Sequence, residues 1–359
     1  MIYLNNAATS FPKPPSVIEA MMTAMKNPPV SPFRSNAQGS DLLTNTRKLL
    51  GNLFNIGDYE RIFFCSSATD AINRVLGGKN KTIVATSDNH NSVLRPLMNG
   101  YHLVKIIPPI TPSDTIPNAS LLIINHCSNV TGHIVDVAEI THRAHQQGML
   151  VMLDAAQSAG CIPIDVDRWG IDILVFTGHK SLFGPTGTGG YYVHRNINLR
   201  PTQFGGTGRD SSIILYKDGE WEYEVGTQNV VGIAGLKAGI EYVLKNNVGI
   251  IFHQLQQETN WVIDELRHIE KVSLYSKGGE NQGPVISFNI NGLLPSDVGY
   301  ILQNSYDITV RTGLHCAPLI HQQFGISEYG SVRVSISHFT KHEELQTFIN
   351  AIREITLSL

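Results

Sequence analysis

The chain has 359 residues, of which 42% are hydrophobic and 16% charged, and its formal net charge is −3. That length exceeds one typical domain of about 100–200 residues, so we expect two packed domains. The Lys and Arg residues form no run, which argues against a nucleic-acid partner. The longest apolar stretches fall far short of the ~20 residues that span a bilayer, and the N-terminus lacks the features of a secretory signal. We therefore expect a cytoplasmic protein with no membrane attachment and no nucleic-acid partner.

Short apolar runs alternate with helix-like segments between about residues 60 and 195. The predicted strands are Arg61–Cys65, Thr82–Thr86, Leu103–Ile107, Leu121–Asn125, Leu150–Asp154, Ile171–Phe176 and Gly190–Val193. The predicted helices between them include Asp70–Leu76, His90–Asn99 and Asp136–Gln147. Most runs are rich in Val, Ile and Leu on both faces, as is typical of strands covered on both sides. This alternation predicts an α/β fold with a mainly parallel mixed sheet, and places functional residues just past the strand ends.

The rhythm changes after about residue 230. Two predicted helices, Gly232–Asn246 and Gly249–His268, precede predicted strands at Val285–Ile290, Ile308–Arg311 and Ser331–Ile336 and a last helix at Lys341–Glu354. This order indicates a smaller α+β domain. We expect a large α/β domain over residues 15–245, and a small domain that combines residues 1–14 with residues 246–359.

Two of the predicted strands carry chemistry at their ends. Asp154 ends one apolar run, and Lys180 follows the next run 26 residues later, directly after His179. A pyridoxal-5′-phosphate (PLP) site needs this pair, because a lysine amine binds the aldehyde while a carboxylate keeps the pyridine nitrogen protonated. The glycines near Lys180 are expected to let cofactor and backbone approach closely. They are Gly178, Gly184, Gly187, Gly189 and Gly190.

Nucleotide-binding motifs do not fit the same region. The glycine-rich stretch 184–190 does not open a helix after a strand in the Rossmann manner, and residues 178–181 lack the spacing of a P-loop. A phosphate group is better served by residues 66–71, where serine and threonine hydroxyls precede a predicted helix N-terminus. His90 also lies between a predicted strand and a predicted helix, although most of the 14 histidines are expected to be structural.

The four cysteines contain no CxxC pair and no zinc-ligand spacing, so we expect free thiols and no metal site. Cys65, Cys127 and Cys161 have small or apolar neighbours and are expected to be buried. Cys316 differs because it follows His315 in a loop bounded by glycine and proline, where a thiol is exposed and partly ionised. His315 either tunes this thiol or only shapes its loop.

Together these segments resemble the class V aminotransferase-like cysteine desulfurases of the NifS/SufS type, and the likeness runs nearly end to end. The motifs that carry it are Asp154-x-x-Gln157, Thr177-Gly-His-Lys180, Gly226-Thr-Gln-Asn229 and Arg311-Thr-Gly-x-His-Cys-Ala317. The last of them is similar to the second group of the family, whose cysteine lies on a short, ordered loop. The resemblance implies a PLP-dependent transferase fold of type I.

The resemblance also implies cofactor-binding roles. Lys180 matches the lysine that binds the PLP aldehyde and moves the proton at the substrate Cα. Asp154 matches the partner of the pyridine nitrogen, Gln157 the partner of the ring oxygen, and His90 the imidazole stacked on the ring. The residues implied to hold the phosphate are Ser67, Ala68, Thr69, Thr177 and His179.

Further implied roles concern the substrate and a second subunit. Thr227 matches a threonine that completes the phosphate site of the partner subunit, which implies a homodimer with shared active sites. Arg333 matches the arginine that binds the substrate carboxylate, and Asn129 and Asn6 are expected near cofactor and substrate. Cys316 matches the residue that accepts the sulfur.

The implied reaction converts L-cysteine to L-alanine and leaves a persulfide on Cys316, from which a sulfur-acceptor protein would take the sulfur. L-selenocysteine is an alternative substrate with the same backbone, and an aminotransferase, a racemase and a non-catalytic PLP-binding protein are further alternatives. Two departures bear on substrate recognition. Leu314 stands where some relatives have a second histidine, and residues 31–38 lack the Arg-x-x-His arrangement common there.

Overall fold

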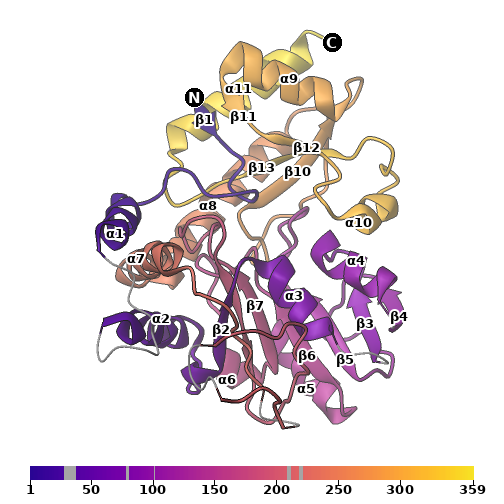
Figure 1. The fold of residues 1–359 in the computed structure, drawn as a ribbon. Coiled ribbons are helices and arrows are strands. Elements are labelled where there is room, and N and C mark those ends of the chain that lie inside the picture. The colour runs from indigo at the N-terminus through magenta and orange to yellow at the C-terminus, as the bar shows by residue number, and fades with distance from the viewer. Residues whose placement is uncertain (28–37, 78–80, 101, 208–211, 218–220) are drawn as a thin grey trace.

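The computed structural model describes residues 1–27, 38–77, 81–100, 102–207, 212–217 and 221–359 (Figure 1). Seven strands form the larger sheet, in the order β2-β8-β7-β6-β5-β3-β4. They are β2 (Ile62–Cys65), β3 (Thr82–Thr86), β4 (Leu103–Ile107), β5 (Leu121–Asn125), β6 (Leu150–Asp154), β7 (Ile173–Thr177) and β8 (Gly189–Val193). Strand β8 runs antiparallel to both β7 and β2, and the other pairs are parallel. The predicted mainly parallel mixed sheet is confirmed.

Both faces of this sheet are covered. In β5, Leu121 and Ile123 belong to one apolar cluster, while Leu122 and Ile124 belong to another, as the two-residue period of a strand requires. The first cluster contains residues of α3 (Ala68–Leu76) and α4 (Asn91–Asn99). The second contains residues of α2 (Gln38–Phe54), α5 (Val137–Gln146), α6 (Val166–Trp169) and α7 (Val230–Asn246). Helix α1 (Pro15–Lys26) packs on α7, and the short helix η1 (Tyr59–Arg61) precedes β2.

A second, four-stranded antiparallel sheet has the order β12-β13-β10-β9. Its strands are β9 (Val272–Leu274), β10 (Val285–Ile290), β12 (Arg311–Gly313) and β13 (Ser331–Ser335). The helices of this part are α8 (Val248–Arg267), α9 (Pro295–Tyr306), α10 (Pro318–Gln323) and α11 (His342–Leu357).

The N-terminal residues lie with this second part of the chain, because β1 (Ile2–Tyr3) pairs in parallel with β11 (Ile308–Thr309). The single strand predicted over Ile308–Arg311 is therefore wrong in detail: its first half pairs with β1, and Arg311 belongs to β12, which pairs with β13. The expected domain boundaries at residues 14 and 245 stay predictions.

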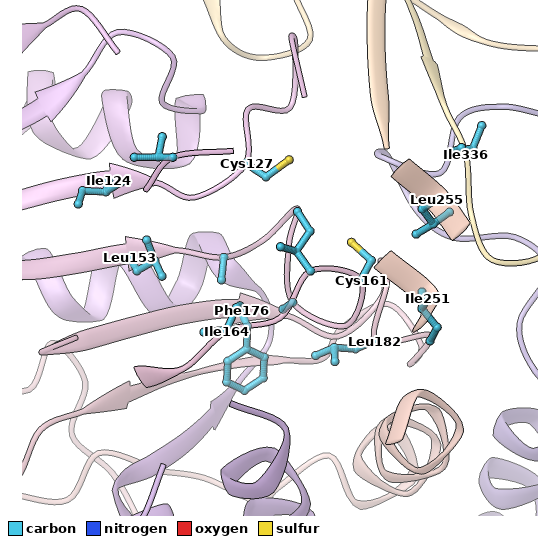
Figure 2. Close-up of a cluster of buried hydrophobic side chains, with 14 of the residues drawn as sticks. Ile124, Cys127, Leu153, Cys161, Ile164, Phe176, Leu182, Ile251, Leu255 and Ile336 are labelled. Atoms are coloured by element: carbon cyan, nitrogen blue, oxygen red, sulfur yellow. The ribbon is translucent and has the colours of Figure 1, made fainter. Parts of the chain in front are cut away.

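One apolar core joins the two sheets (Figure 2). Phe176 and Leu182, on either side of Lys180 in the sequence, belong to the same cluster as Leu255 of α8 and Ile336, which follows β13. Each of these four side chains is buried. Continuous packing of this kind resists displacement, so it fixes the loop after β7 relative to the smaller sheet.

None of the described helices is long and apolar enough to cross a bilayer. The four cysteines are all free, as predicted. Cys127 and Cys161 are buried, whereas Cys65 and Cys316 are partly exposed. The expectation that Cys65 is fully buried is therefore wrong, although its thiol still donates to the carbonyl oxygen of Ser67 at 3.2 Å.

Candidate active site

A cavity of about 220 Å³ lies at the carboxyl ends of β6 and β7. This is the edge at which parallel α/β sheets bind their ligands. The structure brings most of the predicted site residues together here. Those that line the cavity are Ser67, Ala68, Thr69, His90, Asn129, Asp154, Gln157, Thr177, His179, Lys180 and Arg333.

Lys180 and Asp154 form the electrostatic centre of the cavity. Burial lowers the pKa of Lys180 to about 8, an effect that Asp154 opposes and that Arg333 reinforces. Asp154 is 4% exposed, and its Oδ1 accepts the backbone N–H of Ala156 at 2.9 Å. Burial raises the pKa of Asp154, while the N–H of Ala156 and the charge of Lys180 oppose that rise. The two groups can therefore hold a cationic ring nitrogen and a reactive amine in one cavity.

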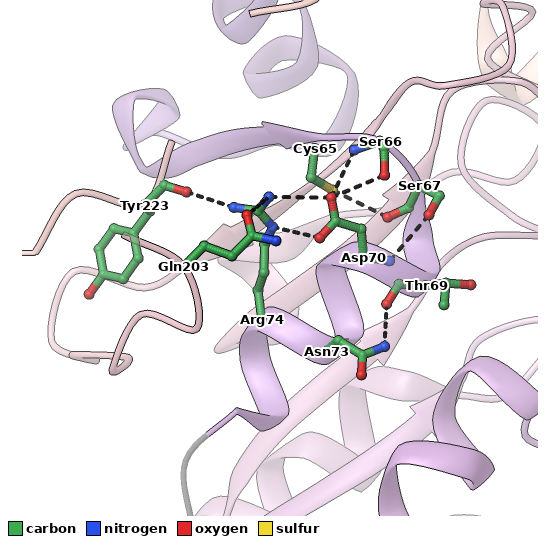
Figure 3. A network of polar contacts seen from close by, with 9 residues as sticks. All are labelled: Cys65, Ser66, Ser67, Thr69, Asp70, Asn73, Arg74, Gln203 and Tyr223. Carbon is green, nitrogen blue, oxygen red and sulfur yellow. Dashed lines mark hydrogen bonds and ion pairs between the residues drawn. The ribbon is translucent and has the colours of Figure 1, made fainter. Parts of the chain in front are cut away.

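The N-terminus of α3 supplies an anion site at one end of the cavity. Ser67 is the N-cap, and its Oγ accepts the backbone N–H of Asp70 at 3.2 Å. Asp70 itself turns aside to Arg74, with Nε to Oδ1 at 2.8 Å (Figure 3). The amides of Ala68 and Thr69 precede the first hydrogen bond within the helix and so remain available to a ligand.

Unpaired polar atoms point to the same ligand. Thr177 Oγ1 and His179 Nδ1 are buried without a hydrogen-bond partner among the described residues, although buried polar atoms are normally paired. Both residues line the cavity that contains the α3 N-terminus. A phosphate group would satisfy these donors, so the residues present fit PLP.

His90 lies over the start of α4 as its N-cap. Its Nδ1 accepts the backbone N–H of Ser92 at 3.0 Å, which places the ring proton on Nε2. Burial first, and then the positive charge of Lys180, lower the pKa of His90 to about 4. His90 is therefore a neutral ring in the cavity wall.

Arg333 carries a buried positive charge from β13 into the cavity, and it is 1% exposed. Its Nη1 donates to the carbonyl oxygen of Asn129 at 3.0 Å and its Nη2 to Oδ1 of Asn5 at 3.4 Å. Its Nε has no partner among the described residues, and the structure gives it no carboxylate partner there. A buried arginine with unused donors is suited to bind a carboxylate of the substrate.

The loop that carries Cys316 borders this cavity through Arg311 and His315, which both line it. His315 and Cys316 have φ angles of 48° and 58°, in the left-handed region that costs a non-glycine residue about 1–2 kcal/mol. Two hydrogen bonds stabilise the loop: Asn129 Nδ2 donates to the carbonyl of His315 at 2.7 Å, and the N–H of Asn91 donates to that of Cys316 at 2.7 Å. Cys316 is thus held on an ordered loop.

Arg311, not His315, contacts the thiol: its Nη2 lies 3.4 Å from Sγ of Cys316. His315 turns away, with Nε2 3.1 Å from Oγ of Ser331, which also lies 3.2 Å from Nε2 of His321. Because His321 Nδ1 donates to the carbonyl of Ala317, its Nε2 accepts the Ser331 proton, and His315 must donate from Nε2. Burial lowers the pKa of His315 to about 2. Of the two roles left open for His315, the geometry favours shaping the loop.

Two of the residues predicted to bind cofactor or substrate lie elsewhere. Thr227 lines a neighbouring cavity with Ser66 and Asp70 instead of the cavity of Lys180. Asn6 is buried, and its amide is occupied: Nδ2 donates to the carbonyl of Ser335 at 3.0 Å, and Oδ1 accepts the N–H of Phe11. The substrate-binding prediction for Asn6 does not fit this geometry, in which it holds the N-terminal segment. Residues 31–37, where a motif was missing, lie outside the described residues.

The glycines near Lys180 do not act as predicted. A Cβ on Gly178 would lie 2.2 Å from Oγ1 of Thr188, and one on Gly190 would lie 2.6 Å from the carbonyl oxygen of Phe63. A Cβ on Gly189 would meet the backbone of Ser67 at 2.9 Å. These glycines therefore allow close packing of the protein's own segments, and none of the three lines the cavity.

Several residues of the wall had no role expected from the sequence. They are Ala7, Ala8, Ser92, Asn125, Ala156 and Arg311. Arg311 stood within a recognised motif, so its contact with Cys316 could have been suspected. Asn125 ends strand β5 and is in register with Asp154 of β6. Its position at a strand end is the sequence feature that indicates a place in the site.

Comparison with known proteins places the chain in a well-populated group. Residues 2–348 match the family model described as aminotransferase class-V. A probable cysteine desulfurase of Pyrococcus abyssi is 30% identical, over 100% of this chain and 95% of the relative. Another of Methanothermobacter thermautotrophicus is 32% identical, over 99% and 94%. The apo structure of a cysteine desulfurase from Thermococcus onnurineus is similar with a TM-score of 0.87 at 29% identity, over 100% of this chain and 95% of that one.

Proposed function

The chain belongs to the class-V aminotransferase family, and from that premise we propose that it is a PLP-dependent cysteine desulfurase. It takes the sulfur of L-cysteine, releases L-alanine and holds the sulfur as a persulfide on Cys316. One observation carries this proposal: the cavity that joins Lys180, Asp154 and Arg333 is also lined by Arg311, whose guanidinium lies 3.4 Å from the sulfur of Cys316.

When bound, PLP supplies an electron sink for the charge left at the substrate Cα. Lys180 would hold the cofactor aldehyde and would move the Cα proton, and a pKa near 8 leaves part of its amine uncharged at neutral pH. Asp154 would keep the ring nitrogen protonated. Thr177, His179 and the first amides of α3 would hold the phosphate, and the neutral ring of His90 would contact the cofactor ring.

Arg333 binds the substrate carboxylate and so orients the side chain of the substrate. Arg333 donates to the backbone carbonyl of Asn129, and the side-chain Nδ2 of Asn129 donates to the carbonyl of His315. The group that binds the carboxylate and the loop that accepts the sulfur are therefore held by the same asparagine. This arrangement fixes the distance between the bound substrate and the thiol.

The Cys316 thiolate attacks the sulfur of the substrate. A sulfur–sulfur bond forms while the bond between Cβ and sulfur breaks, and its electron pair stays with the carbon fragment. That fragment takes up a proton and leaves as alanine. Arg311 stabilises the negative charge on Cys316 before the attack, since charged donors bind anionic acceptors more strongly than neutral ones.

The direct test compares product formation by Cys316→Ala, by the matched control Cys65→Ala and by the unchanged enzyme. Both cysteines are partly exposed and free. We expect Cys316→Ala to lose alanine formation from L-cysteine while it keeps the absorbance of bound PLP, and Cys65→Ala to keep both. Cysteine turnover at the original rate in Cys316→Ala would refute the persulfide assignment. If Cys316→Ala still turned over L-selenocysteine but no longer L-cysteine, a selenocysteine lyase would be favoured.

We also propose a homodimer with shared active sites, supported by the position of Thr227 outside the cavity of its own Lys180. Mixed dimers test this assignment. A dimer of Lys180→Ala and Thr227→Ala subunits contains one intact site only if Thr227 serves the partner. Recovery of activity on mixing, compared with either variant alone, is the expected result, and its absence would place Thr227 in its own subunit.

The remaining parts of the proposal concern location and the sulfur acceptor. Free thiols on all four cysteines are typical of a reducing compartment, which supports a cytoplasmic protein. An acceptor protein would approach the partly exposed Cys316 on its ordered loop. Incubation of the persulfide-loaded enzyme with candidate acceptors, followed by mass measurement of both chains, identifies the recipient.

A further inference from the structure

The N-terminal segment lies directly on the main chain of the lysine that is proposed to bind PLP. Three groups of this segment donate to the carbonyl oxygen of His179: the N–H of Ser10 and Thr9 Oγ1 at 3.1 Å, and Nζ of Lys13 at 2.7 Å. Ser10 Oγ lies 2.8 Å from the carbonyl oxygen of Lys180. The N-terminal segment therefore binds both carbonyl oxygens that flank the Lys180 Cα.

The hydrogen-bond directions within this group follow from the chemistry of Lys13. An ammonium group only donates, so Lys13 Nζ donates to Ser10 Oγ as well, also at 2.7 Å. The hydroxyl proton of Ser10 is then free to point elsewhere. Its shorter acceptor is Lys180 O at 2.8 Å, against 3.2 Å to His179 O. Lys13, Ser10 and Lys180 thus form a chain with one defined direction.

Lys13 is an unusual residue to find in this place. Burial lowers its pKa to about 8, and no carboxylate among the described residues forms an ion pair with it. A partly desolvated ammonium without a counter-charge is costly, because its hydration must be replaced. The hydrogen bonds that Lys13 donates to His179 O and Ser10 Oγ replace that hydration here.

We propose that Lys13 is a positioning residue for Lys180, which acts through Ser10 and the carbonyl oxygens of His179 and Lys180. It limits the movement of the loop after β7, so that the Lys180 amine stays where it can reach the PLP aldehyde. This inference rests on the proposed role of Lys180, and it requires no particular substrate.

The test measures how fast Lys180 reacts. Apo-protein of the full chain is mixed with pyridoxal 5′-phosphate, and the growth of the bound-cofactor absorbance gives the rate. The second readout omits the cofactor: trace acetylation of the apo-protein with mass spectrometry gives the relative reactivity of the Lys180 amine. For Lys13→Met we expect both rates to fall about tenfold, the usual effect of losing a charged hydrogen bond. For Lys13→Arg, which keeps a charged donor, we expect most of both rates to return.

Two further variants separate positioning from general destabilisation. Lys81 is also a half-buried lysine that donates to a carbonyl, that of Val75, and burial lowers its pKa too. We expect Lys81→Met to leave both rates unchanged. Ser10→Ala removes the relay to Lys180 but keeps the charge of Lys13, and we expect it to slow both rates as well. Rates in Lys13→Met and Ser10→Ala equal to those of Lys81→Met would overturn the inference. Neither readout depends on cysteine turnover. A failure of the desulfurase proposal can therefore be told apart from a failure of the role proposed for Lys13.

Discussion

The Nη2 atom of Arg311 lies 3.4 Å from Sγ of Cys316, whereas the neighbouring imidazole of His315 is turned toward Ser331. The sequence places His315 next to the cysteine, but the fold places the charge of Arg311 there. Because burial keeps His315 neutral, the positive charge next to the thiol comes from the Arg311 guanidinium.

Replacement of Arg311 should therefore slow the reactions of Cys316. A hydrogen bond to a charged group contributes about 1.5–3 kcal/mol, and partial exposure reduces it, so we expect Arg311→Met to lower the rate about threefold to tenfold. The measurement is alkylation by iodoacetamide at pH 7.5, followed by mass spectrometry. Burial raises the pKa of Cys65 to about 12 and that of Cys161 to about 11, which keeps these thiols unreactive. Arg311→Lys is the charge-conserving control, and an equal rate in all three proteins would exclude this role.

Asn129 should couple substrate binding to the cysteine loop. An aspartate there could not donate to the carbonyl of His315, and its charge would compete with the substrate carboxylate for Arg333. We expect Asn129→Asp to raise the KM for L-cysteine at least about tenfold, the effect of a lost charged contact. Asn129→Ala removes the donor without adding charge, so its KM should rise less. The same KM in both variants would mean that Asn129 acts only on the loop.

The stability of the protein should fall between pH 7.5 and 5.5, in part because of His126. This side chain is 2% exposed, its Nδ1 lies 2.8 Å from Oγ of Ser158, and burial lowers its pKa to about 4. The unfolded chain takes up the proton near pH 6.5 and the folded chain does not, so the folded state loses stability as the pH falls from 6.5 toward 4. From these values His126 accounts for a loss of about 1 kcal/mol at pH 5.5.

Urea unfolding of the unchanged protein and of His126→Gln at both pH values measures that contribution. The variant should be less stable at each pH, yet its loss between them should be smaller by about 1 kcal/mol. Other buried histidines, such as His90 and His179, are unchanged in both proteins and cancel in the comparison. An identical loss would show that His126 is not the group that titrates.

The strands that carry the site could be predicted from sequence because their patterns are local. Strands β3, β4, β5 and β6 match their predicted ranges residue by residue, since each is a short apolar run with clear ends. Helices α1 and α9 were not predicted, although both begin at a proline in the first turn, a start signal that was present in the sequence. Only one residue of α1, Val17, is buried.

The site was predictable where it depends on strand ends and unpredictable where it depends on long-range contacts. Asp154 ends β6 and Lys180 follows β7, and neighbouring parallel strands end at one edge of the sheet. The approach of Lys13 to the carbonyl of His179 joins residues 166 positions apart, and no local pattern encodes it. The turn of His315 toward Ser331 likewise depends on the pairing of β12 with β13.

Gly189 should control how the α3 N-terminus meets the phosphate. A Cβ at this position would lie 2.9 Å from both Cα and C of Ser67, and backbone atoms cannot yield as a flexible side chain can. The N-cap of α3 would have to move, which displaces the amides of Ala68 and Thr69 from the cavity. Overpacking of this kind costs about 1–3 kcal/mol, so we expect Gly189→Ala to lower PLP affinity about tenfold or more. Equilibrium dialysis with PLP measures this affinity.

A Cβ on Gly206 would meet no described atom within 4 Å, so Gly206→Ala should bind PLP as the unchanged protein does. Tight PLP binding by Gly189→Ala would mean that the α3 N-terminus can move without loss of the phosphate contacts. The α3 N-terminus would then not be one of the groups that determine PLP affinity.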